Sequence, residues 1–171
     1  DIVLGKSLLP ETNGFKGNIH ELRVWESPRT AGKLTTNMLI SLSGKETDLI
    51  GYWPMNDAYG DLVAEKVHGK NAAVQAEWLI TPQGYAGTFN SSGNGLIDLN
   101  FTDVAFTQEE DFTIEFWFKS NDGSNVCFMS NGHGDENDLT VYYISPESLD
   151  KIVRSIPLED NIDSLLTPLL N

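Results

Sequence analysis

The sequence has a single cysteine, Cys127, among its 171 residues. One cysteine cannot form a disulfide within the chain, and no second cysteine accompanies His20, His68 or His133 at the spacing of a zinc site. No apolar run approaches the roughly 20 residues of a transmembrane helix, and the first residues lack the order of basic, apolar and small residues of a signal peptide. We therefore expect a soluble piece of a larger protein, without membrane insertion.

Basic residues are also scarce. The chain has 11 Lys and Arg against 25 Asp and Glu, which gives a formal net charge of -14. A chain this acidic is repelled by phosphate backbones and anionic lipids, so we exclude nucleic acid as a partner. The 40% apolar content is sufficient for the core of a domain of ordinary size.

Strict alternation of apolar and polar residues predicts strands. Residues 111–119 place an apolar side chain at every even position, which gives one face directed into a core. Further short strands are expected at 49–55, 95–99, 126–129 and 139–144, separated by clusters of Asn, Asp and Gly. Many short strands with such turns predict an all-β fold, an antiparallel β-sandwich.

A second alternating stretch ends at Trp25. On a regular strand Leu22 and Val24 share one face, while Glu21 and Arg23 lie with Trp25 on the other. This pattern is typical of a strand that is covered on both sides and carries a polar pair in one layer.

Two segments have helical signals. Ser27 can cap a short helix, since Pro28 suits its first position and Leu34 and Met38 are spaced for one face. The tail, residues 145–171, repeats apolar residues at helical spacing and is interrupted by prolines. Because such short helices are marginal alone, we expect the tail to pack on another chain or domain, or to be separated from the preceding residues in the gene.

The stretch GFKGNIHELRVW, residues 14–25, and LIGYWPMN, residues 49–56, resemble the laminin-G-like and pentraxin-like jelly-roll modules of the concanavalin A-like lectin and glucanase superfamily. In that family the first motif is a closing strand. Residues 89–99 and DFTIEFWF, residues 111–118, resemble the beginning of such a module. The resemblance implies a jelly-roll sandwich, and its middle strands are missing from this chain.

The order of these motifs implies a repeat boundary. Residues 1–80 would be the C-terminal part of one laminin-G-like module plus a linker, residues 81–144 the N-terminal part of the next, and residues 145–171 a helical tail of uncertain origin. The strands that contain Leu22 and Phe116 should then belong to different repeats, unless the chain is permuted. Direct packing of one strand on the other in one sandwich would contradict the two-repeat interpretation.

Catalysis is not expected. Glycoside hydrolases of this superfamily need two carboxylates placed across the scissile bond, and the pattern Glu-x-Asp-x-x-Glu is absent. Glu21 has two interpretations: an ion pair with Arg23, or, as the resemblance implies, a calcium ligand. Calcium binds six to eight oxygens, and Asp135 and Asp138 lie in an oxygen-rich loop that can contribute. Calcium is the cofactor that these residues suggest.

The four tryptophans are candidates for stacking on sugar rings. Trp25 and Trp117 stand in predicted strands and are expected in the core, whereas Trp78 and Tyr85 lie in a less regular stretch and are the better candidates. We therefore expect a secreted or cell-surface recognition module that binds a glycan or an extracellular protein and adjoins neighbouring repeats. The alternatives are a structural spacer without a ligand and, last, a glycoside hydrolase; an exposed aromatic side chain lining a groove would favour glycan binding.

Overall fold

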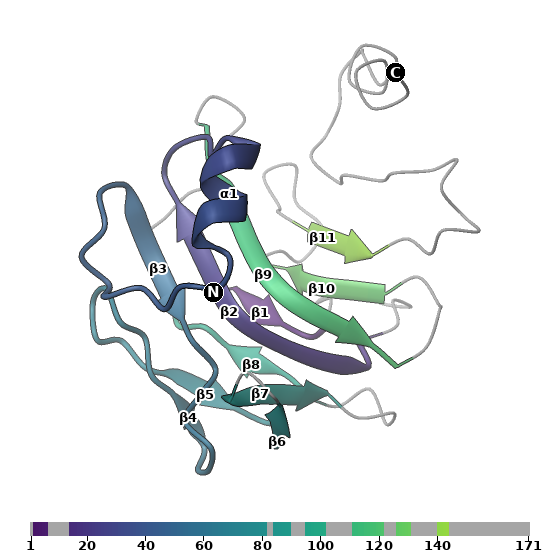
Figure 1. The fold of residues 1–171 in the computed structure, drawn as a ribbon. Coiled ribbons are helices and arrows are strands. Elements are labelled where there is room, and N and C mark those ends of the chain that lie inside the picture. The colour runs from purple at the N-terminus through teal and green to yellow at the C-terminus, as the bar shows by residue number, and fades with distance from the viewer. Residues whose placement is uncertain are drawn as a thin grey trace.

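The computed structural model describes residues 2–6, 14–81, 84–89, 95–101, 111–121, 126–130 and 140–143. These residues form β-strands and one short helix (Figure 1). The elements are β1 (Val3–Leu4), β2 (Gly17–Trp25), α1 (Ala31–Asn37), β3 (Leu49–Trp53), β4 (Leu62–Val63), β5 (Ala72–Val74), β6 (Glu77–Thr81), β7 (Gly84–Phe89), β8 (Ile97–Asp98), β9 (Thr113–Ser120), β10 (Val126–Ser130) and β11 (Thr140–Tyr143).

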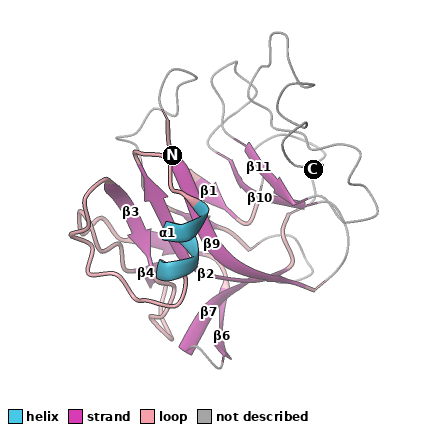
Figure 2. Ribbon diagram, turned by 45° about the horizontal axis from the view of Figure 1, so that its top comes forward, coloured by secondary structure: helices cyan, strands magenta, loops and turns pink. Residues whose placement is uncertain are grey.

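The strands form two antiparallel sheets that make a β-sandwich, which confirms the predicted all-β class. One sheet has six strands in the order β11-β10-β1-β8-β5-β4. The other runs β3-β2-β7-β6, with β9 paired to the remaining edge of β2. Helix α1 lies over β2 and β9 on the outer side of the second sheet (Figures 1 and 2). No helix in the described part of the chain is long and apolar enough to cross a membrane.

The main core lies between the sheets. The predicted inward face of residues 111–119 is confirmed for Phe112, Ile114 and Phe116, which pack against the buried cluster. Phe118, at the end of this face, keeps 43% of its surface exposed. Phe128 of the opposite sheet lies 5.0 Å from Phe116 between ring centroids. Fully buried members of the cluster include Leu4, Ile19, Leu22, Val24, Trp53, Met55, Val63, Ala72, Ile97, Leu99 and Met129. Trp25 is also fully buried, as predicted, in a smaller cluster.

Strand β2 pairs with β9 over its whole length, from Gly17 opposite Ser120 to Trp25 opposite Thr113. The prediction that these strands belong to different repeats is therefore wrong for an unpermuted chain, because they share one sheet. The alternative left open in the sequence, a permuted chain in which residues 1–80 and 81–144 complete one sandwich, stays a prediction.

Close approach of these two strands depends on Gly17. Its φ of 152° is one that residues with a side chain rarely adopt. An added Cβ would also overlap the backbone carbonyl oxygen of Lys119. A glycine at this position therefore lets the start of β2 reach its partner.

The hairpin of β6 and β7 differs from expectation. Residues 77–89 contain two paired strands, with Trp78 opposite Gly87, rather than the expected irregular stretch. The glycines of β7 weaken the strand signal, so pairing with neighbours decides its conformation.

Helix α1 begins later than predicted, since Thr30 accepts a hydrogen bond from the Lys33 N–H at 3.3 Å and acts as N-cap. Ser27 instead donates to Asp48 at 3.1 Å.

Candidate functional site

A β-bulge in β2 creates the polar part of the site. Ile19 pairs with Phe118 and Val24 with Ile114, and the register shifts between His20 and Arg23. The extra residue is accommodated at Glu21, whose φ is 55°. The bulge changes which side chains share a face, so Ile19 joins the core with Leu22 and Val24 instead of lying on the face of Arg23.

Arg23 is the centre of a cluster on the outer face of this sheet, where only 2% of the residue is exposed. Its Nη2 donates to Glu21 Oε2 at 2.6 Å, and its Nη1 donates to Glu115 Oε1 at 3.4 Å. The same two nitrogens donate to backbone carbonyls of the helix end, Nη1 to Asn37 at 3.0 Å and Nη2 to Ile40 at 2.6 Å. The predicted ion pair of Glu21 with Arg23 is confirmed.

Each carboxylate of the cluster has a further donor. The Tyr52 hydroxyl donates to Glu21 at 3.0 Å, and the indole N–H of Trp25 donates to Glu115 Oε1 at 2.9 Å. Burial and the nearby negative charge of Glu21 raise the pKa of Tyr52 to about 12, so the phenol stays protonated as a donor at neutral pH. The side chains of Glu21 and Glu115 keep 15% and 16% of their surface exposed, so both are mostly buried beside Arg23.

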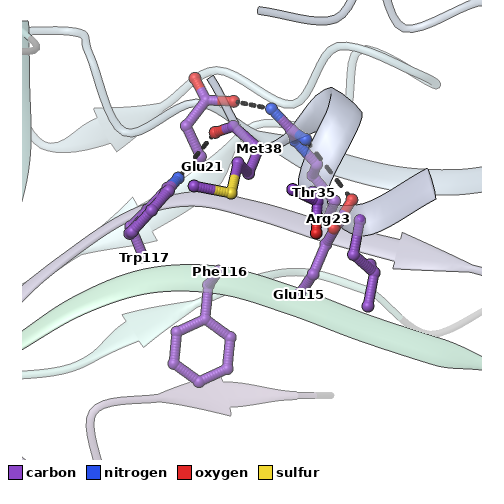
Figure 3. A pocket seen from close by; sticks show the side chains of 8 residues that line it. Glu21, Arg23, Thr35, Met38, Glu115, Phe116 and Trp117 are labelled. Atoms are coloured by element: carbon purple, nitrogen blue, oxygen red, sulfur yellow. Dashed lines mark hydrogen bonds and ion pairs between the residues drawn. The ribbon is translucent and has the colours of Figure 1, made fainter. Parts of the chain in front are cut away.

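A hollow of about 250 Å³ opens between this cluster and helix α1. The sheet lines it with Glu21, Arg23, Glu115, Phe116 and Trp117, and the helix side lines it with Leu34, Thr35 and Met38. Figure 3 shows the ring of Phe116 on the opposite side of β9 from the other labelled side chains, consistent with its place in the core. The hollow thus combines two carboxylates and a guanidinium with apolar side chains.

Trp117 stands at the hollow with 37% of its surface exposed. Its indole N–H donates to the Met38 carbonyl at 2.8 Å, and its ring is stacked with the imidazole of His20 at a centroid distance of 6.3 Å. Burial lowers the pKa of His20 and Arg23 lowers it further, while Glu21 opposes the shift, so a neutral imidazole is favoured. The prediction that Trp117 is a core residue is wrong, because it lies on the outer face of its strand.

The predicted site residues that the structure describes, Glu21, Trp78 and Tyr85, lie on three different strands, β2, β6 and β7. Glu21 lines the hollow. Trp78 lies on β6, where its indole N–H donates to the Gly60 carbonyl at 3.2 Å, and Tyr85 lies on β7 opposite Ile80. Asp135 and Asp138 lie outside the described residues, and the residues that are described contain no group of three or more acidic, His or Cys side chains placed to hold a metal.

Calcium binding at Glu21 with the 135–138 loop therefore stays a prediction. Both oxygens of Glu21 accept hydrogen bonds, so a calcium ion there would compete with Arg23 and Tyr52. A rise in melting temperature in millimolar calcium, relative to chelator, would support the prediction.

Sequence reasoning missed Glu115 and the helix residues of the hollow, and it set Trp117 aside as a core residue. Glu115 and Trp117 stand on the polar face of a strongly predicted strand, which was the available signal. Their proximity to Glu21 depends on the bulge and on the register of β2 against β9, and neither can be read from one strand.

Comparison with family models, with curated proteins and with solved structures gave no match. The resemblance to laminin-G-like modules therefore stands on the sequence motifs, and the geometry of the hollow is the basis on which a function is proposed.

The chemistry available in the hollow is that of hydrogen bonding and stacking. Carboxylates shared by one guanidinium accept hydrogen bonds from hydroxyl groups strongly, because an ionised acceptor strengthens the bond. An indole face offers an apolar platform with a fixed orientation.

Proposed function

We propose that this chain is a non-catalytic recognition module of laminin-G-like, jelly-roll type in a secreted or cell-surface protein, and that it binds a glycan in the hollow beneath α1. The observation that carries the proposal is the exposed indole of Trp117 beside Glu21 and Glu115, whose partly exposed side chains line the same hollow. An exposed aromatic side chain that lines a groove is the feature expected to favour glycan binding, and Trp117 has that position at the hollow.

The site has the complementary surfaces of a sugar ring. The apolar side of a pyranose stacks on an indole, and its hydroxyl groups donate to carboxylates. The volume of about 250 Å³ is below the roughly 300–1,000 Å³ of pockets that enclose drug-sized ligands. The hollow therefore suits one sugar residue of a longer chain, with the remainder in solvent.

A protein ligand is the second candidate. Met38, Leu39 and Ile40 form a short apolar group beside the hollow, with exposed fractions of 37%, 77% and 52%. Exposed apolar side chains at the rim of a polar site are a feature of protein interfaces. A partner that covers them would add apolar burial to the contacts of the hollow.

Titration with a panel of soluble cello-, manno-, galacto- and chito-oligosaccharides, followed by calorimetry, tests the glycan proposal. We expect one class to bind, and Trp117→Ala to weaken its affinity about tenfold, because aromatic stacking contributes on the order of 1 kcal/mol beyond burial. Trp78→Ala is the matched control and should retain binding.

Loss of binding in Trp78→Ala but not in Trp117→Ala would instead place the site on β6. Failure of the whole panel to bind would contradict the glycan proposal and favour the protein ligand or a spacer without its own ligand.

A further inference from the structure

The segment that covers the hollow has little apolar attachment to the sandwich. It comprises residues 30–40, from the N-cap of α1 to Ile40, and is called the cap below. None of the residues of α1 is buried, and the helix has only 7 residues. A helix this short is marginal in isolation, so its persistence depends on contacts with the rest of the protein.

Polar contacts hold the C-terminal end of the cap. Arg23 donates to the carbonyls of Asn37 and Ile40 at 3.0 and 2.6 Å. Trp117 donates to the carbonyl of Met38 at 2.8 Å. Met38 and Ile40 follow the last helical residue, Asn37, whose carbonyl also accepts from the Ile40 N–H at 3.0 Å. Two side chains of the sheet therefore tie down the end of the cap.

The chain on either side of the cap is fixed separately. Before it, the Thr113 hydroxyl on β9 accepts from the Arg29 N–H and donates to the Ser27 carbonyl, both at 2.9 Å. After it, the Leu42 N–H donates to the Tyr52 hydroxyl at 3.3 Å. The cap is thus a segment between two attached ends.

The hollow lies between the cap and the sheet. Leu34, Thr35 and Met38 line it from the cap, opposite Trp117 and Glu115 of β9 (Figure 3). A molecule in the hollow touches both walls, and contacts to both walls exist only while the cap is closed.

We infer that the cap opens locally while the sandwich stays folded, that Arg23 and Trp117 form its latch, and that a sugar residue bound in the hollow holds it closed. Lids of this kind shield a bound ligand and often set its release rate. The opening of the cap is inferred from contacts within the protein itself, whereas its closure by a sugar rests on the proposed function.

Native-state hydrogen exchange of the whole chain, read by mass spectrometry, tests the opening. Amides of residues 31–40 should exchange far faster than those of β2 and β3. Trp117→Phe keeps an aromatic ring but removes the bond to Met38, so exchange in the cap should rise about 3- to 10-fold while β2 and β3 are unchanged. Trp78→Phe is the control, because it removes an indole bond to a backbone carbonyl elsewhere.

Gly32→Ala provides a change of opposite sign. An added Cβ at Gly32 meets nothing within 4 Å, and alanine favours the helix. Exchange in the cap should therefore slow by about 2- to 5-fold. Cap amides that exchange only with global unfolding, or that respond equally to Trp117→Phe and Trp78→Phe, would overturn the inference.

The oligosaccharide panel tests closure. A sugar that binds at Trp117 should slow exchange of the cap and dissociate faster from Trp117→Phe. Binding that leaves cap exchange unchanged refutes closure by the ligand but leaves the glycan proposal standing. If no sugar binds while Trp117→Phe still accelerates the cap alone, the glycan proposal and closure by a sugar both fail, and the opening of the cap stands.

Discussion

Replacement of Arg23 by methionine is the sharpest test of the cluster beneath the cap. Methionine matches the length of the arginine stem and keeps the contacts of an apolar side chain, but it removes the guanidinium. Glu21 and Glu115 would then face each other without the cation that both contact at 2.6 and 3.4 Å. The Ile40 carbonyl would also lose the Arg23 donor at 2.6 Å, whereas the Asn37 carbonyl keeps the bond from the Ile40 N–H at 3.0 Å.

The magnitude follows from the burial of the charges. Arg23 is 2% exposed, and removing one partner of a buried ion pair costs about 3–5 kcal/mol because the remaining charge is uncompensated. For a domain of this size each kcal/mol corresponds to about 2–4 °C in melting temperature, so a loss of about 6–20 °C is expected.

Urea unfolding, followed by tryptophan fluorescence and circular dichroism, measures the change in stability. The triple variant Arg23→Met, Glu21→Gln, Glu115→Gln should recover a large part of the loss, because neutral amides retain acceptors for Tyr52 and Trp25 without the repulsion. A value for Arg23→Met within about 0.5 kcal/mol of the parent chain, or no recovery in the triple variant, would refute the reasoning.

Three further predictions concern the sandwich. Burial and the charge of Glu21 raise the pKa of Tyr52 from 10.0 to about 12, so its contribution to stability is complete below about pH 10 and is lost as the pH rises toward 12; Tyr52→Phe should remove that part of the pH dependence in alkaline urea unfolding. Gly17→Ala should destabilise the fold by about 1–3 kcal/mol through overlap with the neighbouring strand, whereas Gly32→Ala, where a Cβ meets nothing, should leave the unfolding midpoint equal or higher. Glu65→Gln should lower the free energy of unfolding by about 2–4 kcal/mol and broaden or shift the NMR signals of residues 65–69. The buried carboxylate accepts two backbone N–H bonds on each oxygen, whereas an amide has one oxygen and so can accept only two of the four. An unchanged unfolding midpoint would contradict that account.

Alternation and turn residues made several strands predictable, but not the shortest ones. Ile114 and Phe116 of β9 were predicted to face the core and pack on it, and β8 lies within the strand predicted at 95–99. Strands β1 and β4 have two residues each, too few for any period to be detected. Pairing across the sheet stabilises such strands, and that information lies in distant parts of the chain.

The sequence by itself determined the fold class and the buried position of Trp25, because local alternation and apolar character act over a few residues. For Glu21 it left an ion pair with Arg23 and a calcium site as alternatives. Only the tertiary structure decided the site. The bulge at Glu21 re-aims the side chains that follow it, and the register of β2 against β9 brings Glu115 to Arg23 across 92 positions of the chain. Local patterns contain neither the bulge nor the register, since both depend on how the whole sheet pairs and twists.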